Sequence, residues 1–204
     1  MGKPIVPVAL GVLGLIGVIV CCAVPHWIVV YGKLPTGEVE QLAQYGLWKF
    51  CMVLLNERLE CVNFEVPPIL ASTYHATKAM TVISCLLTCL SLLILLIQHF
   101  GASCIPYLQN EDAKPKIYLV VGVGLLLAGL LVIISAISLP HALEQFLKSN
   151  LEGGRKSFVL VKGSCVYVGW MAGLLLLLDG GLLCFFRKKT TQIGSVNITL
   201  CRFF

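Results

Sequence analysis

The sequence predicts a mostly α-helical membrane protein, in which four membrane-spanning helices carry a small antiparallel β-sheet outside the cell. Apolar residues make up 58% of the 204 residues and charged residues only 12%, whereas soluble domains hold about 45–50% and about 25%. Four long segments are nearly free of charged residues. Between the first two lies a polar segment, 27–61, which holds two of the three tryptophans and a closely spaced cysteine pair.

Each of the four apolar segments is long enough to cross a bilayer as a helix, which takes about 20 residues. Their Leu, Val and Ile residues, mixed with small ones, favour helices over barrel strands, which would alternate polar and apolar residues. We place the spans near 5–25, 79–98, 117–139 and 164–186. The first lacks a convincing cleavage site and is longer than the apolar core of a signal peptide. We therefore expect it to be retained as a span.

The orientation prediction depends on the basic residues 187–189, which directly follow the fourth span. Because basic residues beside a span favour the cytoplasm, they predict a cytoplasmic C-terminus. Four spans then place the N-terminus on the same side. The cytoplasmic segments would be 1–4, 99–116 and 187–204, and the extracellular segments 26–78 and 140–163.

The ten cysteines divide according to compartment. Only Cys51 and Cys61 lie in an extracellular segment, where two cysteines with nine residues between them predict a disulfide. A zinc site is the alternative, but it needs two more ligands, so we expect no metal. Closing this ring would stabilise a hairpin by roughly 2–3 kcal/mol. Cys104 and Cys184 flank the inner membrane face, a position that favours S-acylation.

The first extracellular segment has the pattern of a small sheet. Residues 28–31 form a β-branched and aromatic run typical of a strand. Two more runs, 50–55 and 59–64, predict a hairpin that the cysteine pair would close across its turn. Residues 69–77 can turn helical and lead into the second span. A sheet this small needs a packed hydrophobic face, which the helix bundle must supply.

Two features of the spans concern packing. Small residues give the third span a face for close helix contacts; they are Gly122, Gly124, Ala128 and Gly129. The chain after residue 140 can extend this helix beyond the membrane.

In the fourth span, Asp179 is a functional candidate because ionisable residues are rare within spans. The alternative is a structural role, with the side chain facing a neighbouring helix or the inner interface.

A set of spaced residues in the first extracellular segment forms a recognisable pattern: Trp27, Gly46, Leu47, Trp48, Cys51 and Cys61. On composition alone, Trp27 would be an ordinary interfacial anchor. The spacing of the set, however, resembles the W…GLW..C…C signature of claudins. Relatives such as the peripheral myelin proteins, epithelial membrane proteins and calcium-channel gamma subunits share this signature. YVGW at 167–170 and GGLLC at 180–184 are similar to the claudin fourth span and favour claudins proper.

The resemblance implies a left-handed four-helix bundle with a five-stranded extracellular sheet. It also implies partners: the chain itself and other claudins, in the same membrane and on the adjacent cell. Together they would form a barrier or weakly selective channel of the tight junction at the plasma membrane. The alternative is a regulatory subunit of another membrane protein, such as an ion channel.

The resemblance also assigns the residues that would face the paracellular pore. In claudins, charges on the strand after the second cysteine set ion selectivity. Here the residue after that cysteine is the neutral Val62, and the nearest following acid is Glu65. The charges of the segment as a whole are nearly balanced. We therefore expect weak selectivity; ordinary solvated loop charges are the alternative.

Subunit contacts are expected among five further positions. Phe146 matches an aromatic residue that claudins use in lateral contacts. Val66 or Ile69, or Pro67 between them, would meet it from the short helix before the second span. Packing of Phe146 on its own bundle is the alternative. Met52, in the apolar run of the hairpin, is a candidate for contact with a protein on the opposing cell.

Two departures from the family pattern stand out, and the sequence does not support an enzymatic or nucleic-acid-binding function. Lys78 replaces an arginine that claudins usually carry before the second span, and residues 201–204 read CRFF where most claudins end in Tyr-Val. This ending argues against binding to PDZ scaffolds. The chain shows no nucleophile–base pair, phosphate loop or metal spacing, so we expect neither an enzyme nor a cofactor. The net charge of +5 lies beside the membrane, where it would meet lipid rather than nucleic acid.

Overall fold

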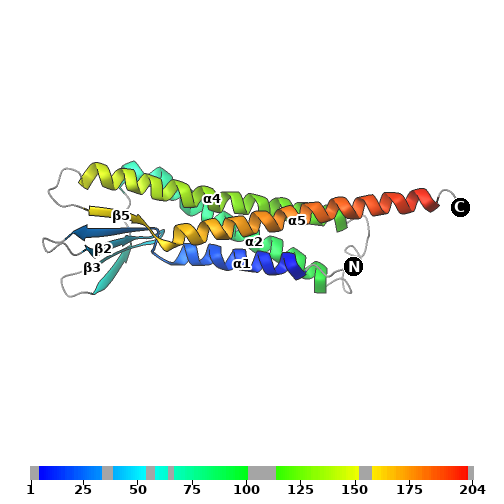
Figure 1. Ribbon diagram of the computed structural model, residues 1–204, viewed down its shortest axis with the longest axis horizontal. Coiled ribbons are helices and arrows are strands. Elements are labelled where there is room, and N and C mark those ends of the chain that lie inside the picture. Colours follow the sequence, from blue (N-terminus) through cyan, green and yellow to red (C-terminus); the bar gives the residue numbers. More distant parts are fainter. Residues whose placement is uncertain are drawn as a thin grey trace.

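The computed structural model describes residues 5–33, 39–53, 58–63, 67–100, 114–151 and 158–201. The helices are α1 (Ile5–Ala23), α2 (Pro68–Phe100), α4 (Lys114–Leu151) and α5 (Ser164–Cys201). The strands are β1 (Ile28–Lys33), β2 (Val39–Tyr45), β3 (Lys49–Val53), β4 (Leu59–Asn63) and β5 (Phe158–Lys162). The helices lie side by side in an elongated bundle, the sheet lies at one end, and α5 extends beyond the other helices at the opposite end (Figure 1).

All four helices are long and apolar enough to span a membrane, as predicted. Three of them continue past the predicted spans. α2 begins at Pro68, whose fixed φ and missing N–H suit the first helical position, so the expected helical lead-in over 69–77 is confirmed. α4 continues to Leu151, which confirms the expected extension of the third span. α5 continues to Cys201, so the chain after the fourth span remains helical.

Small residues allow α4 to approach two neighbours closely. Toward α5, a Cβ on Gly129 would lie 2.8 Å from the carbonyl oxygen of Gly173. Toward α2, a Cβ on Gly124 would lie 2.9 Å from Ser91 Oγ, and the hydroxyl of Ser84 donates a hydrogen bond of 2.8 Å to the carbonyl oxygen of Ala128. The predicted small-residue face is therefore confirmed, and it serves both α2 and α5.

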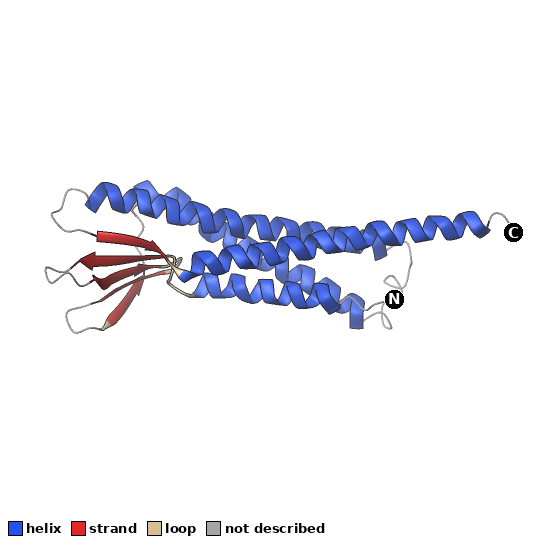
Figure 2. Ribbon diagram, viewed as in Figure 1, coloured by secondary structure: helices blue, strands red, loops and turns tan. Residues whose placement is uncertain are grey.

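The sheet has the strand order β4-β3-β2-β1-β5, and all its neighbours are antiparallel. Figure 2 shows the strands gathered at one end of the bundle. The count of five agrees with the resemblance, although the residue pattern predicts strands only near β1, β3 and β4 and misses β2 and β5. β5 pairs with β1 from Ile28↔Lys162 to Gly32↔Phe158. Its partner lies more than 120 residues away in sequence, so no local signal indicated the pairing.

One hydrophobic core joins the sheet to the bundle. It contains Ile28 and Val30 of β1 together with Leu139 and Leu143 of α4. Trp27 lies in the same core with 1% of its surface exposed, and its Nε1 donates a hydrogen bond of 3.0 Å to the carbonyl oxygen of Cys21. Trp27 is therefore a core residue, and the interpretation as an interfacial anchor is wrong. Its burial gives the sheet the packed face that a small sheet requires.

Candidate functional site

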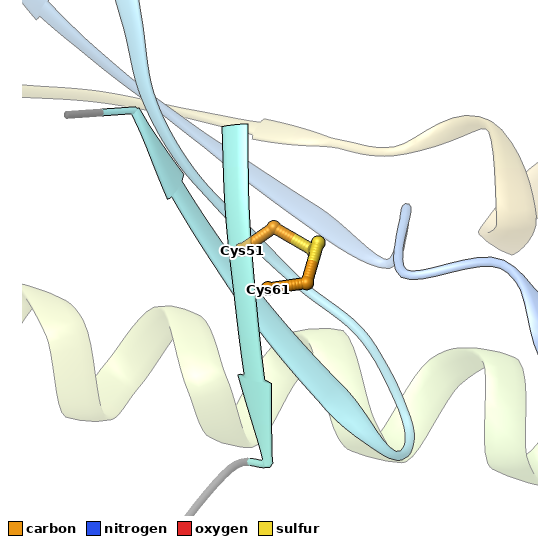
Figure 3. The surroundings of a disulfide bond; sticks show 2 residues. All are labelled: Cys51 and Cys61. Atoms are coloured by element: carbon orange, nitrogen blue, oxygen red, sulfur yellow. A yellow bond between two sulfur atoms is a disulfide. The ribbon is translucent and has the colours of Figure 1, made fainter. Parts of the chain in front are cut away.

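The predicted disulfide closes the hairpin of β3 and β4. Cys51 and Cys61 are register partners on these antiparallel strands, with Cα atoms 4.0 Å apart (Figure 3). Cys51 is buried, whereas all five residues of β4 are exposed. The backbone ladder to β3 and this bond therefore hold β4 in the sheet, while its side chains remain available for contacts.

The loop after β2 is fixed against the helices by the signature residues. Leu47 is buried, and a Cβ on Gly46 would lie 2.6 Å from Pro25 Cβ, so a larger residue would push the loop off the end of α1. The N–H of Gly46 donates to the carbonyl oxygen of Lys49 over 2.9 Å. From α2, the buried hydroxyl of Tyr74 donates to the carbonyl oxygen of Gly46. These contacts set where the hairpin leaves the bundle.

Trp48, unlike the buried signature residues Trp27, Leu47 and Cys51, is half-exposed. Its side chain is 45% exposed, and the Lys78 ammonium lies 4.9 Å from its ring centroid. The same ammonium lies 4.8 Å from the ring of Tyr74. Lys78 thus makes cation–π contacts with one ring from the loop and one from its own helix. The lysine that replaces the expected arginine connects the sheet to α2.

The pore candidate Val62 is 55% exposed on β4. Its register partner is Phe50, and paired residues project to the same face of a sheet. Phe50 packs against the core between sheet and bundle, so Val62 lies on the bundle-side face of the hairpin. The second candidate, Glu65, lies outside the described residues.

The structure adds Glu60 to the pore candidates. Glu60 is exposed, pairs with Met52 and lies two residues before Val62. Side chains alternate between faces along a strand, so Glu60 and Val62 share the bundle-side face. The alternation was present in the sequence, but choosing the relevant face required the packing of Phe50. Neighbouring Tyr45, whose ring lies 4.7 Å from that of Phe50, adds no charge at neutral pH. A phenol ordinarily has a pKa of about 10, and burial raises the pKa of this one further.

The contact candidates lie on three different elements. Ile69, in the first turn of α2, is 79% exposed, which is unusual for a large apolar side chain on the sheet side of the molecule. Met52 is exposed on β3. Phe146, on the part of α4 that extends beyond the predicted third span, is half-buried and packs against the core between sheet and bundle. Val66 lies outside the described residues.

Asp179 faces α1 and is fully buried, with 0% of its surface exposed. A Cβ on Gly11 would lie 2.8 Å from its Oδ2, so the absence of a side chain at Gly11 makes room for the carboxyl group. Within the described residues, neither carboxyl oxygen has a hydrogen-bond partner. Burial of such a group destabilises the fold.

The lipidation candidates are only partly described. Cys184 is half-buried, and its Sγ would lie 2.7 Å from a Cβ on Gly122. The thiol therefore packs toward α4, and an acyl chain would require the side chain to turn outward. Cys104 lies outside the described residues.

Comparisons with known proteins agree over most of the chain. The model of the PMP-22/EMP/MP20/Claudin family matches residues 1–183. Claudin-4 of Homo sapiens is 35% identical over 185 residues, which cover 90% of this chain and 86% of that protein. Claudin-3 of Canis lupus familiaris is also 35% identical over 185 residues, which cover 90% of this chain and 82% of that protein.

Proposed function

Since this chain belongs to the PMP-22/EMP/MP20/Claudin family, we propose that it is a structural protein of tight junctions that assembles into strands and restricts passage between cells. The observation that carries the proposal is the β3–β4 hairpin, which a disulfide closes at the end of the four-helix bundle. Its outermost strand, β4, exposes every side chain while a disulfide holds it in place. An exposed strand that a disulfide holds in the sheet is suited to contacts between chains.

The orientation follows from two chemical arguments. A disulfide forms and persists in an oxidising compartment, so the sheet with Cys51 and Cys61 faces the extracellular side. The basic residues 187–189 follow the last membrane span and favour the cytoplasm. Both chain termini then lie in the cytoplasm, and the sheet enters the space between two cells.

Lateral assembly uses exposed apolar side chains on the sheet side. Ile69 of one chain meets the surface around Phe146 of the next, since an exposed apolar anchor gains most when it enters a partly apolar pocket. Met52, exposed on β3, contacts a protein of the opposing cell. The partners are other copies of this chain and other claudins.

The hairpin face that carries Val62 and Glu60 lines the paracellular path. Val62 is neutral, and Glu60 is one carboxylate in an aqueous environment, where a unit charge acts only over about 8–10 Å. This chain is therefore a barrier, or a weakly selective channel with a slight preference for cations.

The deciding experiment is expression of the full chain in cells that lack tight-junction strands. Freeze-fracture images should show strands at cell contacts, and transepithelial resistance should rise. Dispersed particles together with an altered ion-channel current would overturn the proposal, because a regulatory subunit of a channel behaves in that way.

A further inference from the structure

The ammonium group of Lys78 lacks an anionic partner in the described part of the chain. Its contacts are with the faces of Trp48 and Tyr74, at 4.9 and 4.8 Å from the ring centroids. Lys148 and Glu144 form an ion pair of 2.7 Å elsewhere, but no described carboxylate pairs with Lys78 in this way. An ammonium group has three N–H donors. Two rings can receive two of them, so one donor remains.

The position of Lys78 along α2 coincides with a change in the exposed surface. On the same helical face, one turn earlier, lies the exposed His75, whereas Val82 one turn later and Leu86 two turns later are exposed and apolar. Exposed apolar residues on a membrane-spanning helix face lipid tails, and the polar ones face water. Lys78 therefore lies at the boundary between them, where lipid headgroups are found.

The loop that carries Trp48 lies at the same boundary. α1 ends at Ala23, and Pro25 follows directly after that end. Gly46, two residues before Trp48, packs against Pro25 because it has no side chain, so the loop lies beside the end of α1. Trp48 is half-exposed there, as is typical of tryptophans at a membrane–water interface. Since Tyr74 donates a hydrogen bond to the Gly46 carbonyl oxygen, the loop and the helix hold both rings in fixed positions around the ammonium.

We propose that Lys78, held between Trp48 and Tyr74, binds a phosphate oxygen of a phospholipid headgroup in the membrane leaflet on the side of the sheet. A lysine binds phosphate as a point charge, through a short charge-assisted hydrogen bond. The exposed ring of Trp48 covers the glycerol region of the same lipid. The proposal requires only that the helices cross a membrane, so it is independent of strand formation.

The test is native mass spectrometry of the full chain in detergent, with phosphatidylcholine or with diacylglycerol of the same acyl chains. The wild-type chain should retain phosphatidylcholine about fivefold better than diacylglycerol, as expected for one charge-assisted hydrogen bond at an interface. Lys78→Met should remove this preference, whereas Lys78→Arg should keep most of it. Equal retention of the two lipids by the wild-type chain would overturn the proposal without any variant.

The matched control is Lys162→Met. Lys162 is exposed at the end of β5, opposite Ile28, and so lies near the same end of the bundle, but no ring contact of its ammonium is present among the described residues. This variant should retain phosphatidylcholine like the wild type. An equal loss in both lysine variants would mean a general attraction of basic residues to lipid and would contradict a site at Lys78. Loss of phosphatidylcholine in the presence of inorganic phosphate, with phosphate itself bound instead, would assign the site to the free anion.

A folding defect in Lys78→Met is recognised independently of lipid. If this variant unfolds at a lower temperature but keeps the preference for phosphatidylcholine, Lys78 acts only as a cation–π link between sheet and helix, and the lipid site is refuted. If Lys78→Met fails to fold, two measurements still test the lipid site: the preference of the wild-type chain for phosphatidylcholine over diacylglycerol, and the same preference in Lys78→Arg. Both proteins keep the positive charge at position 78.

Discussion

Tyr74 of α2 donates a buried hydrogen bond to the backbone carbonyl oxygen of Gly46, and so ties the start of the β3–β4 hairpin to a membrane-spanning helix. The two residues are 28 positions apart in sequence. The contact lies beside the Lys78 ammonium and the Trp48 ring. It explains how a small sheet keeps a fixed direction relative to the bundle, which assembly between chains requires.

Tyr74→Phe should lower the free energy of unfolding by about 1–3 kcal/mol, because it leaves a buried carbonyl oxygen without its donor. The measurement is thermal unfolding in detergent. The control is Tyr167→Phe, since Tyr167 is exposed on α5 with its ring against Trp170. An equal decrease in both variants would show that the hydrogen bond of Tyr74 is not what stabilises the loop.

Gly180→Ala should destabilise the bundle by about 1–3 kcal/mol through overpacking. A Cβ at Gly180 would lie 2.6 Å from the Gly122 carbonyl oxygen and 2.8 Å from the Leu126 side chain, so α4 and α5 would have to separate. Gly181→Ala is the adjacent control, because a Cβ there meets nothing within 4 Å. Its unfolding temperature should stay equal or rise, and a loss as large as that of Gly180→Ala would contradict the close helix contact.

Val62→Asp should raise the ratio of sodium to chloride permeability by about two- to fivefold, because it places a second carboxylate beside Glu60 on one hairpin face. Dilution potentials across epithelial monolayers measure the ratio. Asn63→Asp adds the same charge one residue later, where the alternation of a strand turns it to the opposite face. If Asn63→Asp has the larger effect, the opposite face of the hairpin lines the path.

Ile69→Ser should shorten or abolish strands while changing the free energy of unfolding by less than about 0.5 kcal/mol, since the side chain is 79% exposed. Freeze-fracture imaging and thermal unfolding together separate assembly from folding. Val159→Ser, at an exposed valine of β5, is the control. Normal strands from Ile69→Ser would remove Ile69 from the lateral contact.

Asp179→Leu should leave strand formation intact and should maintain or raise the unfolding temperature. Its carboxyl group is fully buried beside Gly11 without a hydrogen-bond partner in the described residues. Replacing such a group with an apolar one removes a desolvation cost of about 1–3 kcal/mol. The control is Asp179→Asn, which keeps the shape of the side chain but removes its ability to ionise. Loss of strands in a well-folded Asp179→Leu protein would instead give this carboxyl a function.

The sequence by itself determined the features that depend on neighbouring residues. Four apolar runs of sufficient length predict four spans, because a bilayer offers the backbone no hydrogen bonds outside a helix or a closed barrel. Cys51 and Cys61 flank a predicted turn, so their pairing also required only local information. The spacing of Trp27, Trp48 and the two cysteines indicated the family, which the comparison over residues 1–183 confirms.

Only the tertiary structure decided which way individual side chains face and which distant segments meet. Residues 158–161 include two valines and a phenylalanine, a composition that favours a strand, but only the pairing with β1 places β5 in the sheet. Trp27 is buried although Trp48, of the same signature, is half-exposed, because one lies under the sheet and the other on a loop beside Lys78. Asp179 faces α1 because Gly11 leaves it room. Such outcomes depend on contacts between different helices and strands, and the residues of one element by themselves do not specify those contacts.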